Sequence, residues 1–180
     1  MSGHSKWSQI KHQKGVADAK KGQLFSKFSK LISIAAKTGA DPANNPSLAA
    51  VIERARAANM PKDNIERAVK RAGEKDAATI QELTVQALGP GNVGIVITAV
   101  TDNRNRTLGD IKTILAKHGT KMAGEGSLNY LFDRVMTPEG LEWRAKFPAA
   151  VEEKTKVALE TLFEELGTHD DVENIFSNLP

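Results

Sequence analysis

Residues 80–100, IQELTVQALGPGNVGIVITAV, contain two strand patterns on either side of a glycine-rich turn. The first pattern alternates loosely, with apolar side chains at Ile80, Leu83, Val85 and Ala87. The second is the β-branched run from Val93 to Val100, and Gly89-Pro90-Gly91-Asn92 supplies the turn between them. These patterns predict a β-hairpin, so we expect the fold to contain an antiparallel sheet.

The same glycines match the dinucleotide-binding pattern G-x-G-x-x-G, from Gly89 to Gly94. That pattern binds a pyrophosphate only when a helix N-terminus follows the last glycine. Here the β-branched residues of a strand follow instead. The sequence therefore favours a hairpin turn, and we expect no nucleotide cofactor.

Three amphipathic helices are predicted before the hairpin. Apolar residues recur at a spacing near 3.6 over residues 16–37, which predicts the first helix. Asn45-Pro46 offers a cap and a first-turn proline for a second helix that runs to about residue 59, and a third is predicted over residues 61–73. These helices would form a small bundle, followed by a polar hinge at residues 74–79.

A second group of elements is predicted after the hairpin. Thr107 is expected to cap a helix, with Asp110 completing a variant of the capping box, and this helix would end at His118-Gly119. The other expected elements are a strand over residues 127–132, an irregular stretch over 135–148, a helix over 149–166 and a strand over 172–176. The whole pattern predicts an α+β fold, with a three-helix bundle and basic arm in residues 1–75 and a small ferredoxin-like sheet domain in residues 76–180.

Charge divides the chain at the same place. Residues 1–75 contain 15 Lys+Arg and 6 Asp+Glu, whereas residues 76–180 contain 10 and 16. A basic unit joined to an acidic one predicts that the first binds a polyanion that the second would repel.

Composition narrows the class of protein further. The chain is 40% hydrophobic and 26% charged, which is typical of a globular protein, and it has no cysteine. The lack of cysteine excludes a disulfide framework, thiolate zinc sites and a cysteine nucleophile. No apolar run is long enough to span a bilayer, so we expect a cytoplasmic protein that does not enter a membrane.

The N-terminal arm is the strongest candidate for nucleic-acid contact. Residues 1–30 hold seven lysines against one acid, Asp18. Trp7 lies among them, where it would stack on a base or dock on the bundle, and this argues against an inert solubilising tail. The expected contacts are His4, Lys6, Trp7, Lys11, His12, Lys14, Lys20, Lys21 and Lys27.

Arg104 and Arg106 form a second candidate site. They lie in the asparagine-rich segment of residues 102–107, directly before the predicted helix N-terminus, where they would offer planar donors to phosphate. The alternative is that one or both pair with neighbouring acids of the acidic half. Spacing alone leaves these two interpretations open.

The sequence predicts no enzyme. His169-Asp170-Asp171 resembles part of a metal or acid–base cluster, but three consecutive residues do not converge on one point, so a turn and cap are favoured. His118 is expected at a helix C-terminus, where the dipole favours it. Because no nucleophile, base and oxyanion donor can be assembled, we expect no catalytic residue, metal, cofactor or small-molecule substrate.

Several longer motifs resemble the YebC/PmpR family. They are Gly3-His4-Ser5-Lys6-Trp7, Ile10-Lys11-His12, Asn59 to Ala68, Asp102 to Thr107, Gly126-Ser127 and His169 to Val172 with Asn178. The resemblance implies a helical N-terminal domain and two α+β domains, one inserted into the other. This chain has room for only a connector, residues 134–148, in place of the inserted domain.

The same resemblance implies two functions, which the sequence does not separate. Family members are described as probable DNA-binding transcriptional regulators, while mitochondrial relatives are translational activators and some bacterial members act at the ribosome. No helix presents an obvious base-reading surface, and lysines position a protein without specifying sequence. We therefore expect a nucleic-acid-binding regulator of gene expression, whose partner is DNA, or alternatively ribosomal RNA or the ribosome.

Overall fold

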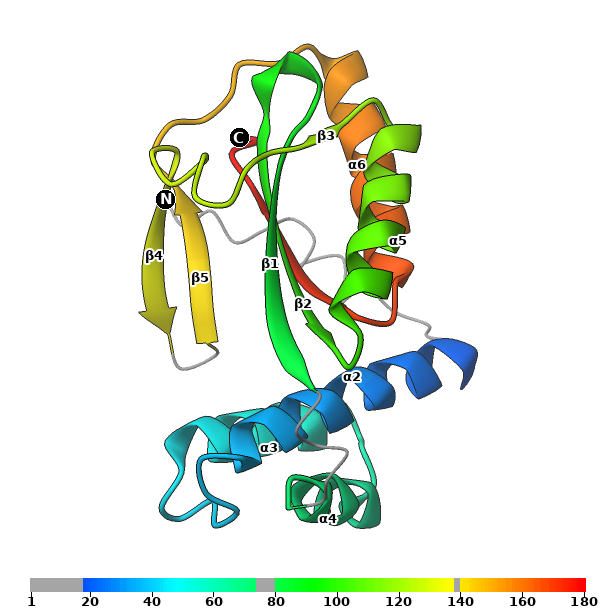
Figure 1. Cartoon of the computed structure of the whole chain (residues 1–180), viewed down its shortest axis with the longest axis vertical. Helices are drawn as coiled ribbons and strands as arrows, with labels where there is room; N and C mark the ends of the chain where they lie inside the picture. The colour runs from blue at the N-terminus through cyan, green and yellow to red at the C-terminus, as the bar shows by residue number, and fades with distance from the viewer. Residues whose placement is uncertain (1–17, 74–79, 138–139) are drawn as a thin grey trace.

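The computed structural model describes residues 18–73, 80–137 and 140–180, with side chains from residue 21 onward. The first described range folds into three helices, α2 (Asp18–Ala36), α3 (Pro46–Ala57) and α4 (Lys62–Arg71). They pack together at one end of the molecule (Figure 1). We call residues 18–73 the helical unit. Its three helices agree with the three predicted from the apolar spacing, whereas the hinge expected at residues 74–79 lies outside the described residues.

The helical unit has its own core. The side chains that fill it come from all three helices and the loops between them: Phe28, Ile32, Ala35, Ala36, Leu48, Ile52, Ala55, Met60, Ile65 and Ala68. The Ser33 hydroxyl donates to the Ala68 carbonyl at 2.9 Å, and this buried bond ties α2 to α4.

Asn45 fixes the turn between α2 and α3. Its side-chain oxygen accepts the Leu48 N–H at 3.1 Å, which makes it the N-cap of α3 as predicted. The amide nitrogen donates to the carbonyls of Ala35, at 2.8 Å, and Gly39, at 2.7 Å, at the end of α2. One buried side chain therefore satisfies the ends of two helices.

The second part of the chain is a four-stranded antiparallel sheet, which we call the sheet unit (residues 80–180). The predicted hairpin forms its centre, with β1 (Gln81–Leu88) paired to β2 (Gly94–Thr101) in full register. The short strand β3 (Lys121–Met122) extends the β1 side, and β6 (Val172–Ser177) pairs with β2, so that the order is β3-β1-β2-β6. Two helices, α5 (Arg104–Lys117) and α6 (Glu153–Thr168), cover one face (Figure 1).

The glycine-rich turn between β1 and β2 is a single 3-10 turn, Pro90–Asn92. Gly91 has φ +71, and a Cβ there would lie 2.8 Å from the Val151 side chain. Both observations require glycine. Strand β2 follows directly, which agrees with the hairpin interpretation and not with a dinucleotide site.

The region after β3 differs from the prediction. Residues 127–131 form turns instead of a strand, and the stretch expected to be irregular contains a second hairpin, β4 (Phe132–Thr137) and β5 (Gly140–Ala145). The rings of Trp143 and Phe132 pack edge to face, with their centroids 6.3 Å apart. Both pack with Val96 on the sheet face opposite α5 and α6. Tertiary packing of two aromatic rings therefore stabilises a hairpin that its own alternation does not reveal.

Two helix starts also differ. Asn103, not Thr107, is the N-cap of α5, because its side chain accepts the Arg106 N–H at 3.1 Å. Helix α6 begins at Glu153, four residues after the expected start at Ala149. Helix α5 ends as predicted, with His118 as its C-cap.

The observed elements confirm the predicted α+β class. Two helices on one face of a four-stranded antiparallel sheet are the layers of a ferredoxin-like domain, although this sheet begins with a hairpin in place of the usual β-α-β unit. No helix in the described ranges is both long and apolar enough to cross a membrane.

Candidate nucleic-acid interface

The structure places only part of the predicted arm. Lys20, Lys21 and Lys27 belong to α2. Only the backbone of Lys20 is described, the Lys21 side chain is exposed, and the Lys27 side chain is half-buried. The remaining arm residues lie outside the described part of the chain: His4, Lys6, Trp7, Lys11, His12 and Lys14.

Asp171 is the centre of the most highly connected polar cluster in the described residues. It lies directly before β6, and its side chain is 2% exposed. The carboxylate accepts hydrogen bonds from Lys30 of α2, from the Arg106 guanidinium at 2.8 Å and from the Thr107 hydroxyl at 2.7 Å. Two helices far apart in the sequence, α2 and α5, therefore share one carboxylate.

The charge of Asp171 is held by its partners. Burial raises its pKa, but the hydrogen bonds from Lys30, Arg106 and Thr107 together outweigh that effect and leave the pKa far below the usual range of an aspartate. Asp171 in turn raises the pKa of Arg106, through their hydrogen bond and through its negative charge. The cluster is therefore a charged network at neutral pH.

His169 binds the backbone of Asp171. Its Nδ1 accepts the Asp171 backbone N–H at 3.1 Å, so the proton of the neutral ring lies on Nε2, which faces Asp110 at 3.3 Å. The backbone carbonyl of Asp171 accepts the Val100 N–H at 2.8 Å. His169 is thus a turn residue, as the sequence favoured, and no group of three potential metal ligands occurs among the described residues.

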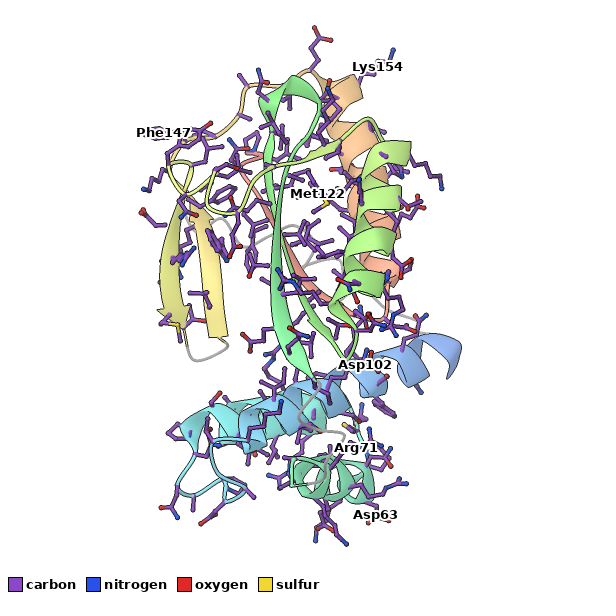
Figure 2. All side chains as sticks on the ribbon, viewed as in Figure 1. Asp63, Arg71, Asp102, Met122, Phe147 and Lys154 are labelled. Atoms are coloured by element: carbon purple, nitrogen blue, oxygen red, sulfur yellow. The ribbon has the colours of Figure 1, made fainter. Side chains whose placement is uncertain are left out.

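The structure separates the two arginines that the sequence left together. Arg106 binds the carboxylates of Asp171 and, at 3.0 Å, Asp102. Figure 2 shows Asp102 at the end of the sheet unit that is nearer the helical unit. Arg104 is exposed in the first turn of α5 and has no acidic partner in the described residues. The pairing interpretation therefore describes Arg106, while Arg104 stays available to a ligand.

Other cations of the helical unit also point at the sheet unit. Lys27 donates to the Gly167 carbonyl at 3.2 Å, and Lys37 donates to the Ile80 carbonyl at 2.7 Å. Arg54 lies over the Phe28 ring at 5.9 Å and approaches Glu173 at 3.9 Å. Lys27, an expected phosphate contact, is therefore held at the unit boundary in this structure.

Helix α4 presents four exposed cations: Lys62, Arg67, Lys70 and Arg71. Lys70 and Arg71 form its last turn, are exposed, and make no ion pair within the described part of the chain. Lys62 pairs with Glu66 at 3.5 Å, and Arg67 bonds to Asn64. Arg71 lies at the end of the molecule that is remote from the α6 start (Figure 2).

The sequence did not single out Lys30 or Asp171 as a pair. Nothing local links them, because they are 141 residues apart. One sequence signal for the burial of Asp171 was available. The strand that follows it has apolar residues at Val172, Ile175 and Phe176, which indicates that this strand enters the sheet.

Comparison with known proteins identifies two matching family models. The model described as the TACO1/YebC protein N-terminal domain matches residues 5–75. The model described as the TACO1/YebC second and third domain matches residues 80–137, and its match ends at the last residue of β4.

Individual relatives cover nearly the whole chain. A probable transcriptional regulatory protein of Treponema denticola is 48% identical over 96% of this chain and 69% of its own length. A protein with the same description from Lacticaseibacillus casei is 41% identical, over 99% of this chain and 73% of its own length. The crystal structure of a conserved hypothetical protein from Aquifex aeolicus has a TM-score of 0.87 and 29% identity, and the match covers 98% of this chain and 97% of that one.

Proposed function

Because the chain belongs to the TACO1/YebC family, we propose that it is a nucleic-acid-binding regulator of gene expression whose basic helical unit and arm bind the phosphate backbone. Relatives are named probable transcriptional regulatory proteins and not enzymes, which supports a regulatory role without catalysis. The proposed location is the cytoplasm.

The observation that carries the proposal is the division of charge between the two units. The basic part of the chain, residues 1–75, has an excess of cations. Lys70 and Arg71 of α4 are exposed and form no ion pair in the described residues. Acids exceed cations in the sheet unit, which would keep nucleic acid away from that side. Such a molecule binds a polyanion in one orientation only.

The expected phosphate contacts are the lysines and histidines of the arm, supported by Lys20, Lys21 and Arg104. Trp7 would stack on a base. Lysine-rich contacts of this kind supply affinity but little sequence information.

RNA or the ribosome is the second candidate partner. Arg106, whose planar guanidinium could read a guanine edge, is held instead by Asp171 and Asp102. This guanidinium is therefore not free to read bases in a duplex. Recognition of backbone and shape, as in structured RNA, fits such a surface at least as well.

The β4–β5 hairpin lies where the family resemblance implies an inserted third domain. The match to the second and third domain ends at residue 137, and the chain spans 69% of the length of the Treponema denticola relative. We take residues 1–75 and 76–180 as the two domains, with residues 134–148 as a connector in place of an inserted third domain. Binding would then depend on the first two domains alone.

The test is a competition titration at physiological salt. A fluorescent DNA duplex bound to the full chain is challenged with unlabelled duplex, structured ribosomal RNA and intact ribosomes. Displacement by RNA or ribosomes at far lower concentration than by DNA would identify a translation factor. Preferential retention on DNA would identify a transcriptional regulator, and absence of binding to all three would overturn the proposal.

The contribution of the arm is measured in the same assay. Replacing Lys11 and Lys14 by Glu should weaken binding to every sequence about equally, because phosphate contacts do not discriminate between bases. The control is the replacement of Lys112 and Lys154 by Glu, which changes net charge equally on exposed positions of the sheet unit. If about six lysines contact phosphate, log K should fall with log salt at a slope of roughly −4 to −6. A slope near zero would mean that the arm is not the binding element.

A further inference from the structure

The boundary between the helical and sheet units has no hydrophobic core of its own. The buried apolar clusters of the described residues lie either within residues 28–68 or within residues 83–175, and none of them crosses. A small cavity is lined by apolar side chains of both units, Leu31 on one side and Val100 and Val172 on the other. A boundary of this kind resembles a transient interface, in which relative movement of the two parts is expected.

Cations of the helical unit make the polar contacts recorded across this boundary in the described ranges. Lys27 and Lys37 donate to carbonyl oxygens, while Lys30 and Arg54 face the carboxylates of Asp171 and Glu173. Positive groups therefore lie on one side and oxygen acceptors on the other. Phosphodiester oxygens offer these cations the same chemistry as the two carboxylates.

We propose that Lys27, Lys30 and Arg54 form a second phosphate-binding surface, which the sheet unit covers in this structure with Asp171, Glu173 and the Gly167 carbonyl. The inference rests on the proposed function, because it adds a surface to the same nucleic-acid-binding unit. Nucleic acid and the sheet unit then compete for the same cations. A change that weakens the docking of the sheet unit therefore strengthens binding of nucleic acid to this surface, at most by the factor with which docking had reduced that affinity.

The exchange leaves no charge buried without a partner. When Lys30 moves to a phosphate, Asp171 keeps its bonds to Arg106 and Thr107, which belong to the sheet unit. Arg54 gives up a 3.9 Å contact with Glu173 and keeps its position over the Phe28 ring. Each group that separates therefore retains a partner or gains water.

The first experiment compares the affinities of three variants for a short DNA duplex and for an RNA duplex of the same sequence. Asp171→Asn and Glu173→Gln each weaken the docking of the sheet unit. Glu142→Gln is the matched control, because this carboxylate is 23% exposed, close to the 20% of Glu173, and its ion pair in the described residues is with Arg144 of the same strand, β5. All three variants remove one negative charge, so the general charge effect cancels.

The proposal predicts that Asp171→Asn and Glu173→Gln bind the preferred duplex at least about fivefold more tightly than Glu142→Gln. Equal or weaker binding would overturn it, since the sheet unit would then support binding instead of blocking it. Glu173 is partly exposed, so its variant keeps the test valid if Asp171→Asn does not fold, which circular dichroism checks.

The second experiment measures the opening directly. The chain has no cysteine, so spin labels can be attached at Asp63→Cys in α4 and Lys154→Cys in α6 without removing other thiols. These two positions lie at opposite ends of the molecule (Figure 2). Double electron–electron resonance should show a changed distance distribution when the preferred duplex is added.

The outcomes separate the two proposals. Binding with an unchanged distance distribution, and with no gain in Asp171→Asn or Glu173→Gln, would overturn the second surface and leave the proposed function intact. Absence of binding by every variant and by the unmodified chain would overturn both.

Discussion

The Asp171 carboxylate joins the helical unit to the sheet unit through three donors. Replacing it by alanine removes the shared acceptor of Lys30, Arg106 and Thr107, and we expect a loss of about 3 kcal/mol in the free energy of unfolding. The control is Asp102→Ala, which removes a 56% exposed partner of the same Arg106 and should cost less than about 1 kcal/mol. Urea denaturation measures both. Equal losses would mean that Asp171 is no more than a surface partner.

The same carboxylate predicts a dependence of stability on pH. The folded pKa of Asp171 lies below that of the unfolded chain, because its three donors outweigh the effect of burial. Its contribution is therefore complete above the ordinary aspartate pKa of about 3.9 and is lost as pH falls further toward the folded value. The free energy of unfolding should decrease on acidification more steeply in the unmodified chain than in Asp171→Asn. Parallel pH profiles would contradict this assignment.

For single residues, the sequence indicated which side chains could bind a partner, but it did not indicate which partner each one has. It left Arg106 open between a phosphate and an acid, and the structure shows why: the deciding acid, Asp171, is 65 positions away. Asp170 is exposed, whereas its neighbour Asp171 is buried. Only the entry of β6 into the sheet distinguishes these two aspartates, and that is a tertiary effect.

Helices and strands were predictable where one pattern dominated. The 3.6 spacing predicted α2, α3 and α4, and the β-branched run predicted β2. The β4–β5 hairpin was missed because charged residues occupy much of its outer surface and Trp143 is buried by contacts with distant residues. Thr107 was mistaken for a cap because its hydroxyl, which could have capped a helix, instead binds Thr101 and Asp171.

Asn45 allows a test of how two elements are joined. Asn45→Ala should lower the free energy of unfolding by about 2 kcal/mol, because it removes the N-cap of α3 and leaves the Ala35 and Gly39 carbonyls without this donor. Asn44→Ala is the neighbouring control. That side chain is exposed and bonds only to Asp41 in the described residues, so the change should stay below about 0.5 kcal/mol. Similar losses in urea denaturation would show that the cap of α3 does not limit stability.

At the scale of the whole molecule, the sequence shows a division of charge between residues 1–75 and 76–180, because charge adds up along the chain without knowledge of contacts. The boundary between them was not visible. It depends on which lysines of α2 reach oxygens of the sheet unit, and helical spacing alone places lysines on the flank of α2 without naming their partners. The structure adds that two cations expected to bind phosphate already have other partners: Lys27 donates to the Gly167 carbonyl, and Arg106 binds the Asp171 carboxylate.

Two units with separate cores should not unfold together. Four of the ten buried residues in the helical core are alanine, against two of fourteen in the main sheet core, so the helical unit buries less apolar surface per residue. We expect it to unfold first. In a Trp7→Phe background, Trp143 fluorescence reports the β4–β5 hairpin and the sheet it covers, and ellipticity at the helical band should change at lower urea than this fluorescence.

Repeating the urea denaturation at low and high salt tests whether the two units unfold separately. Because cations and oxygens dominate the boundary, added salt should screen the contacts that couple the units and move the two transitions further apart. Coincident transitions at both low and high salt would show that the units unfold as one. The polar boundary would then be too strong to open for a nucleic acid, and the competition between phosphate and Asp171 would have no structural basis.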